Sequence, residues 1–109
     1  MDEMDLSRKK CVACEGWMKP MPMFLVKKYL KKVKNWKLKK RKLYKEFKFR
    51  DFKTTLKFVN KIGSIAEKEG HHPDIYFTWG KCSIELYTHA IKGLSENDFI
   101  LAAKINKIK

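Results

Sequence analysis

Three histidines lie within nineteen positions of this chain: His71, His72 and His89. Histidine titrates closest to neutral pH among the side chains, so it can both donate and accept a proton at working pH. Two acids accompany them, Glu67 one helical turn before His71 and Asp98 in the first turn of the last predicted helix. Such a cluster suits an elimination or a hydration, in which one group protonates a leaving hydroxyl and another removes a proton.

Two other interpretations of the histidines remain open on the residues alone. Adjacent histidines before Pro73 are also compatible with a plain polar turn. A zinc site is a rival because histidine is the commonest metal ligand. However, His71 and His72 cannot easily hold one metal from an extended turn, and we expect Cys82 to face the core. A zinc site built on the histidines therefore lacks a natural third or fourth ligand.

The cysteines carry a weaker signal. Cys11 and Cys14 form a CxxC, which is half of a zinc or redox motif, but no second CxxC follows and the strand-to-helix context of a redox motif is missing. We interpret this segment as a solvated loop. Three cysteines are too few for a disulfide scaffold, which favours a reducing cytoplasmic compartment.

Composition bounds the class of protein. The 109 residues, 44% of them hydrophobic, suit one globular domain spanning 1–109. No apolar run approaches a membrane span, and the acidic N-terminus does not resemble a secretory signal. The net charge of +14 is concentrated in residues 27–53, which carry 14 basic residues and two acids. We call this segment the basic block.

The basic block can attract nucleic acid or an acidic partner, or it can be a solvated lysine-rich face. Aromatic residues alternate with its lysines, which superficially resembles a nucleic-acid surface. Strand alternation explains the same pattern, because aromatics would point inward and lysines outward. We therefore expect only weak, non-specific nucleic-acid binding.

The elements that must position the histidines follow from periodicity and caps. Residues 1–20 read as irregular, residues 22–33 as a helix, and residues 35–50 as two strands joined by a turn at 39–42. Asp51 is a plausible cap for a helix over 52–69, in which apolar residues recur at helical spacing, namely Phe52, Leu56, Val59, Ile62 or Gly63, and Ala66.

The second half repeats the alternation of strands and helix. Gly70 suits the left-handed end of the 52–69 helix. Two strands follow, from 75 to 79 and from 82 to about 89, and Ser95 with Asp98 caps a last helix. The order α-β-β-α-β-β-α predicts an α+β fold, with a four-stranded antiparallel sheet and three helices packed on one face.

The motif residues resemble a known family. Glu67-Lys-Glu-Gly-His71-His72-Pro73, then Trp79, then Thr88-His89, then Gly93-Leu94-Ser95-Glu-Asn-Asp98 look like the motif of pterin-4a-carbinolamine dehydratase. The similarity extends to Phe47-x-Phe49-x-Asp51-Phe52 and covers most of the chain. The resemblance implies a four-stranded antiparallel sheet with helices on one side, in agreement with the element order read from the residues.

The resemblance also implies an activity. Family members are hydro-lyases that remove water from 4a-hydroxytetrahydrobiopterin to give quinonoid dihydropterin, so that tetrahydrobiopterin is recycled. They use no metal and no organic cofactor, and they form homodimers and often homotetramers. The small-molecule partner implied here is thus a pterin.

Site residues carry over by matching position. The resemblance implies catalytic roles for His71, His72 and His89, with His72 on the hydroxyl side and the other two sharing the proton transfers. It implies substrate-binding or orienting roles for five further residues, namely Glu67, Pro73, Trp79, Thr88 and Asp98.

The chain departs from the family at two places. Gly70 replaces a polar or acidic residue of some members, and the Ala90-Ile91-Lys92 loop is more apolar and basic than expected. Some animal members also bind a homeodomain transcription factor. The alternative function is therefore a binding module, similar to a transcriptional coactivator, whose basic face contacts a protein or nucleic acid.

Overall fold

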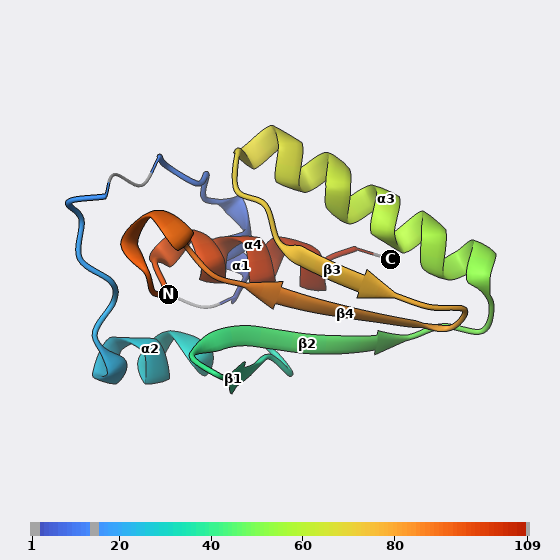
Figure 1. Cartoon of the computed structure of the whole chain (residues 1–109), viewed down its shortest axis with the longest axis horizontal. Helices are drawn as coiled ribbons and strands as arrows, with labels where there is room; N and C mark the ends of the chain where they lie inside the picture. Colours follow the sequence, from blue (N-terminus) through green and yellow to red (C-terminus); the bar gives the residue numbers. More distant parts are fainter. Residues whose placement is uncertain (1–2, 14–15, 109) are drawn as a thin grey trace.

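The computed structural model describes residues 3–13 and 16–108. Four strands form one antiparallel sheet in the order β1-β2-β4-β3, and the helices lie on one side of it (Figure 1). The expected α+β fold is confirmed. The elements are α1 (Glu3–Arg8), α2 (Met23–Leu30), β1 (Lys37–Lys39), β2 (Lys42–Lys48), α3 (Phe52–Glu69), β3 (Asp74–Phe77), β4 (Lys81–Leu86), the 3-10 turn η1 (His89–Ile91) and α4 (Glu96–Asn106).

The basic block forms the β1–β2 hairpin and its flanks, as the alternation predicts. Lys39 pairs with Lys42, and the two residues between them have positive φ angles, 51° at Lys40 and 66° at Arg41. Two consecutive left-handed residues make the tight turn whose twist suits a hairpin. Most lysines of the block are exposed, whereas Leu43 points into the core and is fully buried.

Local signals set the ends of α3 as expected. The Thr54 N–H donates to Asp51 Oδ1 at 2.8 Å. Hydrogen bonds from the side chain and the backbone of Thr54 lower the pKa of the Asp51 carboxyl. At the other end Gly70 has φ 66°, a left-handed conformation that glycine adopts without a Cβ penalty. The chain therefore turns sharply out of α3 just before His71.

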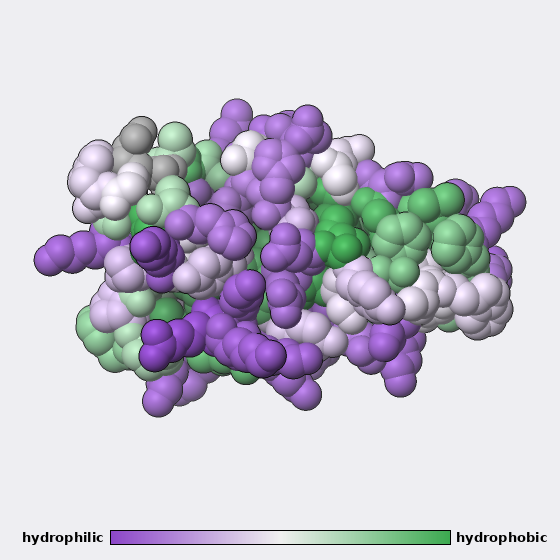
Figure 2. Space-filling view, viewed as in Figure 1, coloured by the Kyte–Doolittle hydropathy of each residue, from purple (hydrophilic) through white to green (hydrophobic). Residues whose placement is uncertain are grey.

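The buried stripe of α3 agrees with the one expected from periodicity at Ile62 and Ala66 and differs from it in the first half of the helix. Thr55, Phe58, Ile62 and Ala66 are buried, whereas Phe52 and Leu56 are 47% and 39% exposed. The Phe58 ring packs 4.7 Å from that of Phe47 on β2, and this contact helps to fix the rotation of the helix. Figure 2 shows the resulting hydrophobic patch near the start of α3 and the β3–β4 turn.

Residues 3–8 form the helix α1, so the expectation of an irregular segment over 1–20 was wrong there. Leu6 has no exposed surface, and the Lys104 side chain of α4 donates to the Ser7 carbonyl at 2.8 Å. Helix α4 is apolar on nearly all sides because α1 covers the face that the sheet does not (Figure 1). No helix in the described ranges is long and apolar enough to cross a bilayer.

Candidate active site

The three histidines come together at one end of the sheet. His71 and His72 follow Gly70 and precede β3, and His89 begins the 3-10 turn that follows β4. Strands β3 and β4 are antiparallel, with Asp74 opposite Glu85, so the start of one lies beside the end of the other. There the structure has a pocket of about 290 Å³. It is lined by Val12, Ala13, Gly70, His71, His72, Tyr87, Thr88, His89, Ala90 and Asn97.

His71 is held from behind by Asp98. Its Nε2 lies 2.6 Å from Asp98 Oδ1, and the carboxylate has no exposed surface. The other carboxylate oxygen accepts from the Thr88 hydroxyl at 2.7 Å and the Ser95 N–H at 3.0 Å. An ionised carboxylate only accepts, so with Asp98 ionised this contact requires a proton on His71 Nε2, and Nδ1 is then the other ring nitrogen.

His72 and His89 stand at the open mouth of the pocket. His72 Nε2 lies 2.5 Å from Glu67 Oε2, and both side chains are exposed. The His89 ring meets the Tyr87 ring edge-on, with centroids 5.1 Å apart. The pocket therefore presents one shielded imidazole and two imidazoles in contact with water.

Six of the eight residues assigned from the sequence belong to this arrangement. The three histidines and Thr88 line the pocket, and Glu67 and Asp98 each contact a histidine. Pro73 and Trp79 do not line it. Trp79 follows β3 at the far end of the β3–β4 hairpin, about 20 Å from Pro73 along the strand, and is 64% exposed. The geometry of a single chain gives Trp79 no contact with the pocket.

One wall of the pocket comes from a segment that the sequence reasoning missed. Asn97, buried beside Asp98, accepts from the Val12 N–H at 3.0 Å and donates to the Val12 carbonyl at 2.5 Å. Glu69 accepts from the Cys11 N–H at 2.8 Å. These bonds tie residues 11–13 beside the histidines. The sequence drew attention to this segment through the Cys11–Cys14 CxxC and a weak resemblance to the family over residues 9–16, but neither placed it beside the histidines.

The CxxC interpretation can be judged at Cys11, since Cys14 lies outside the described residues. Burial, with the nearby Glu69 carboxylate, raises the pKa of the Cys11 thiol to about 12. A redox or metal-binding cysteine needs the thiolate, which this environment disfavours. Across residues 3–13 and 16–108, no three side chains among His, Cys, Asp and Glu form a group that could hold a metal ion.

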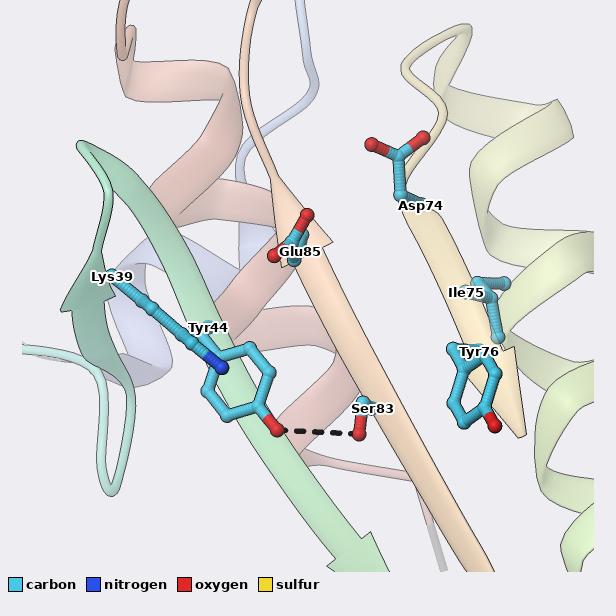
Figure 3. Close-up of a pocket in the computed structure, with 7 residues that line it drawn as sticks. All are labelled: Lys39, Tyr44, Asp74, Ile75, Tyr76, Ser83 and Glu85. Atoms are coloured by element: carbon cyan, nitrogen blue, oxygen red, sulfur yellow. Dashed lines mark hydrogen bonds between the residues drawn. The ribbon is translucent and has the colours of Figure 1, made fainter. Parts of the chain in front are cut away.

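A second hollow, of about 320 Å³, lies on the open face of the sheet (Figure 3). The Tyr44 hydroxyl donates to Ser83 Oγ at 3.3 Å, and the Lys39 ammonium lies 4.4 Å from the Tyr44 ring centroid. Asp74 and Glu85 face each other across β3 and β4. The hollow contains no histidine, and its titratable residues are Lys39, Tyr44, Asp74, Tyr76 and Glu85.

Known proteins show the same sequence pattern and fold. The family model described as Pterin 4 alpha carbinolamine dehydratase matches residues 20–108. A Rickettsia canadensis protein with the provisional name pterin-4-alpha-carbinolamine dehydratase is 49% identical over 102 residues, covering 92% of this chain and 94% of the relative. A relative of the same provisional name from Alkaliphilus metalliredigens is 46% identical over 105 residues, covering 94% and 95%.

A solved structure resembles most of the fold. The crystal structure of a "transcriptional coactivator/pterin dehydratase" from Brucella melitensis superposes with a TM-score of 0.77 at 27% identity. The match covers 81% of this chain and 96% of that one.

Proposed function

Because the chain belongs to the pterin-4a-carbinolamine dehydratase family, we propose that it dehydrates 4a-hydroxytetrahydrobiopterin to quinonoid dihydropterin. In this role it is a hydro-lyase that serves tetrahydrobiopterin recycling. The observation that carries the proposal is the meeting of three histidines, from two different segments, at one pocket, two of them paired with carboxylates. At about 290 Å³ the pocket is near the lower end of the usual range for small-ligand sites, which suits a bicyclic pterin.

The reaction needs one proton delivered and one removed. The C4a–O bond breaks as the hydroxyl takes a proton and leaves as water, while the N5 proton goes to a base and its electron pair forms the C4a=N5 bond. Each transfer needs a group that changes protonation near neutral pH. No bond of substrate to metal or cofactor enters this scheme.

The surroundings of the histidines favour a division of these roles. His71 keeps its Nε2 proton toward the buried Asp98, so its Nδ1 suits the base. His72 and His89 are exposed and can exchange protons with water. We assign His72 to the departing hydroxyl, and His89 to sharing proton transfer with His71. Asp98 and Glu67 act as positioning residues, because neither lines the pocket and each contacts a histidine that does.

The proposal is tested by stopped-flow decay of 4a-hydroxytetrahydropterin with and without the protein. We expect acceleration by the wild type and a loss of at least about ten-fold in His72→Ala and in His89→Ala, since acid–base groups contribute about 10²–10⁴-fold. Circular dichroism checks that both variants fold. Wild-type rates in both variants would refute the mechanism. A chelator should leave the rate unchanged, and loss of activity together with release of stoichiometric zinc would support a metal site instead.

A binding role is the second candidate, and the basic block is the observation that favours it. Most of its lysines are exposed, and the Brucella relative is described as a coactivator as well as a dehydratase. The histidine pocket favours the enzyme, because a pure binding module has no physical need for histidines paired with carboxylates around one pocket.

The proposed enzyme acts as a homo-oligomer in the cytoplasm. A domain of 109 residues buries a modest share of its surface alone, and association is a common remedy. The exposed apolar residues at the start of α3 and the β3–β4 turn, Phe52, Leu56 and Trp79, suit burial against another copy. Among the described residues Cys11 and Cys82 are free thiols, which suits a reducing compartment.

A further inference from the structure

A groove separate from the hollow on the sheet face adjoins the histidine pocket. It has a volume of about 270 Å³, and Tyr87 lines both it and the histidine pocket. Its walls are mostly apolar, and two cationic side chains, Arg41 and Lys92, complete them. The remaining lining residues are Pro20, Met21, Met23, Val26, Leu38, Gly93 and Leu94. A ligand seated against the histidines therefore lies next to this groove, with Tyr87 lining both sites.

The groove is built by fixed contacts between distant segments. The Met21 N–H donates to the Leu94 carbonyl at 2.8 Å. Pro20 packs so closely on Gly93 that a Cβ there would lie 2.4 Å from the Pro20 Cβ, so only glycine fits. On the other side the Lys92 N–H donates to the His89 carbonyl at 3.2 Å. Lys92 thus lies in the same short turn as a histidine of the proposed active site.

The two cations of the groove are not neutralised by carboxylates. Over residues 3–13 and 16–108, neither Arg41 nor Lys92 forms a salt bridge. A third cation, Lys42, lies 5.3 Å from the Tyr87 ring centroid but is 4.0 Å from Glu85. The positive charge available to a ligand near Tyr87 is therefore mainly that of Arg41 and Lys92.

Both cations occupy backbone positions that a smaller residue would adopt more easily. Arg41 has φ 66° and Lys92 has φ 52°, in the left-handed region that Gly and Asn favour. At Arg41 this conformation belongs to the β1–β2 hairpin turn, and at Lys92 it ends the 3-10 turn η1.

From the shared Tyr87, the apolar walls and the two unpaired cations, we propose that this groove is a subsite for a pterin whose C6 substituent ends in an anion. The pterin ring lies against the histidines, and its C6 substituent passes Tyr87 so that the anionic end reaches Arg41 and Lys92. A phosphate and a carboxylate share this chemistry. The inference rests on the proposed function, because it takes the histidine pocket as the ring site.

The test compares three fluorescent or quenching ligands in titrations: neutral 6-hydroxymethylpterin, its monophosphate, and a pteroylglutamate. We expect the wild type to bind at least one anionic ligand about ten-fold more tightly than the neutral one, as one charge-assisted hydrogen bond would give. The phosphate and glutamate arms show which anion fits. Equal affinities for all three ligands would overturn the subsite and leave the dehydratase proposal intact, whereas absence of any pterin binding would refute both.

Substitutions test whether the preference for anionic pterins arises from the two cations of the groove. Lys92→Asn and Arg41→Asn remove a charge while keeping a residue that tolerates positive φ, and each should lower the ratio of neutral to anionic dissociation constants about three- to ten-fold. Lys40→Asn is the matched control, because Lys40 also has positive φ, at 51°, in the same hairpin turn but does not line the groove. If Lys40→Asn lowers the ratio as much as Lys92→Asn, the effect is the general field of a basic protein and the subsite is refuted.

Discussion

Replacement of Asp98 by asparagine tests whether Asp98 holds His71 in the orientation and tautomer that the proposed reaction needs. The buried carboxylate accepts from His71 at 2.6 Å, from Thr88 at 2.7 Å and from the Ser95 N–H at 3.0 Å. An amide has one accepting oxygen and one NH₂ group that only donates. In Asp98→Asn at least one of the three donors must therefore face the NH₂ group or reverse its role.

The number of hydrogen bonds lost sets the expected decrease in the free energy of unfolding. A lost hydrogen bond to a buried charged group costs about 2 kcal/mol, which lowers the melting temperature of a domain this size by about 10 °C. If the NH₂ group faces His71, it stabilises the tautomer with Nε2 unprotonated, and Nδ1, the nitrogen proposed as the base, then carries the proton. We expect kcat for 4a-hydroxytetrahydropterin to fall about 10²-fold with little change in KM.

Two measurements and one control test this reasoning. Long-range ¹H–¹⁵N spectra report the tautomer of His71 in each protein. Ser95→Ala removes the other half of the capping box and should cost about 1 kcal/mol, yet it leaves the His71–Asp98 contact in place. A kcat within two-fold of wild type in Asp98→Asn, with the His71 tautomer changed, would refute the role of this pair. An equal loss of kcat in Ser95→Ala would show that the effect is structural.

Three further predictions concern stability, assembly and charge. Burial alone would raise the pKa of Glu96, but hydrogen bonds from Lys9 and Tyr29 outweigh it and lower that pKa below its usual 4.5. The ionised Glu96 therefore stabilises the fold above pH 4.5, and this stabilisation is lost as the pH falls through the lowered value. Urea titrations at about pH 6 and about pH 3 measure the free energy of unfolding at each pH. This free energy should fall less between the two pH values in Glu96→Gln than in the wild type. Light scattering at micromolar concentration should give a homo-oligomer, and Leu56→Glu, on the exposed face of α3, should shift the mass toward the monomer; a monomeric wild type would contradict this. The basic block should bind duplex DNA with a Kd of about 10⁻⁴–10⁻⁶ M at physiological salt, weakening steeply as salt rises, and a hundred-fold preference between unrelated duplexes in a competition titration would favour the binding role.

Much of the fold was predictable because its signals are local. The Asp51 cap of α3 and the capping box of Ser95 and Asp98 are hydrogen bonds within three residues, so neighbouring residues suffice to specify them. The left-handed end at Gly70 depends on one residue type. The hairpin follows from period-two alternation, which holds whatever the strands pair with. These elements also place His71 and His72 just after α3, and His89 shortly after β4.

The tertiary structure decided what the histidines contact. The pairing of His71 with Asp98 joins residues 27 positions apart, and that of Asn97 with Val12 joins residues 85 apart. No local pattern encodes such contacts, since they depend on how α4 packs between the sheet and α1. The same long-range packing folds residues 3–8 into a helix around the buried Leu6.

Two further outcomes depended on geometry that periodicity cannot supply. Phe52 and Leu56 fit a helical repeat equally well, yet the contact of Phe58 with the sheet leaves them exposed. Trp79 shares the motif with the histidines but lies at the opposite end of a hairpin, because an extended strand carries each residue about 3.3 Å further from its start. Residue types and spacing thus led to the proposed chemistry, and packing between distant segments determined which of these side chains meet.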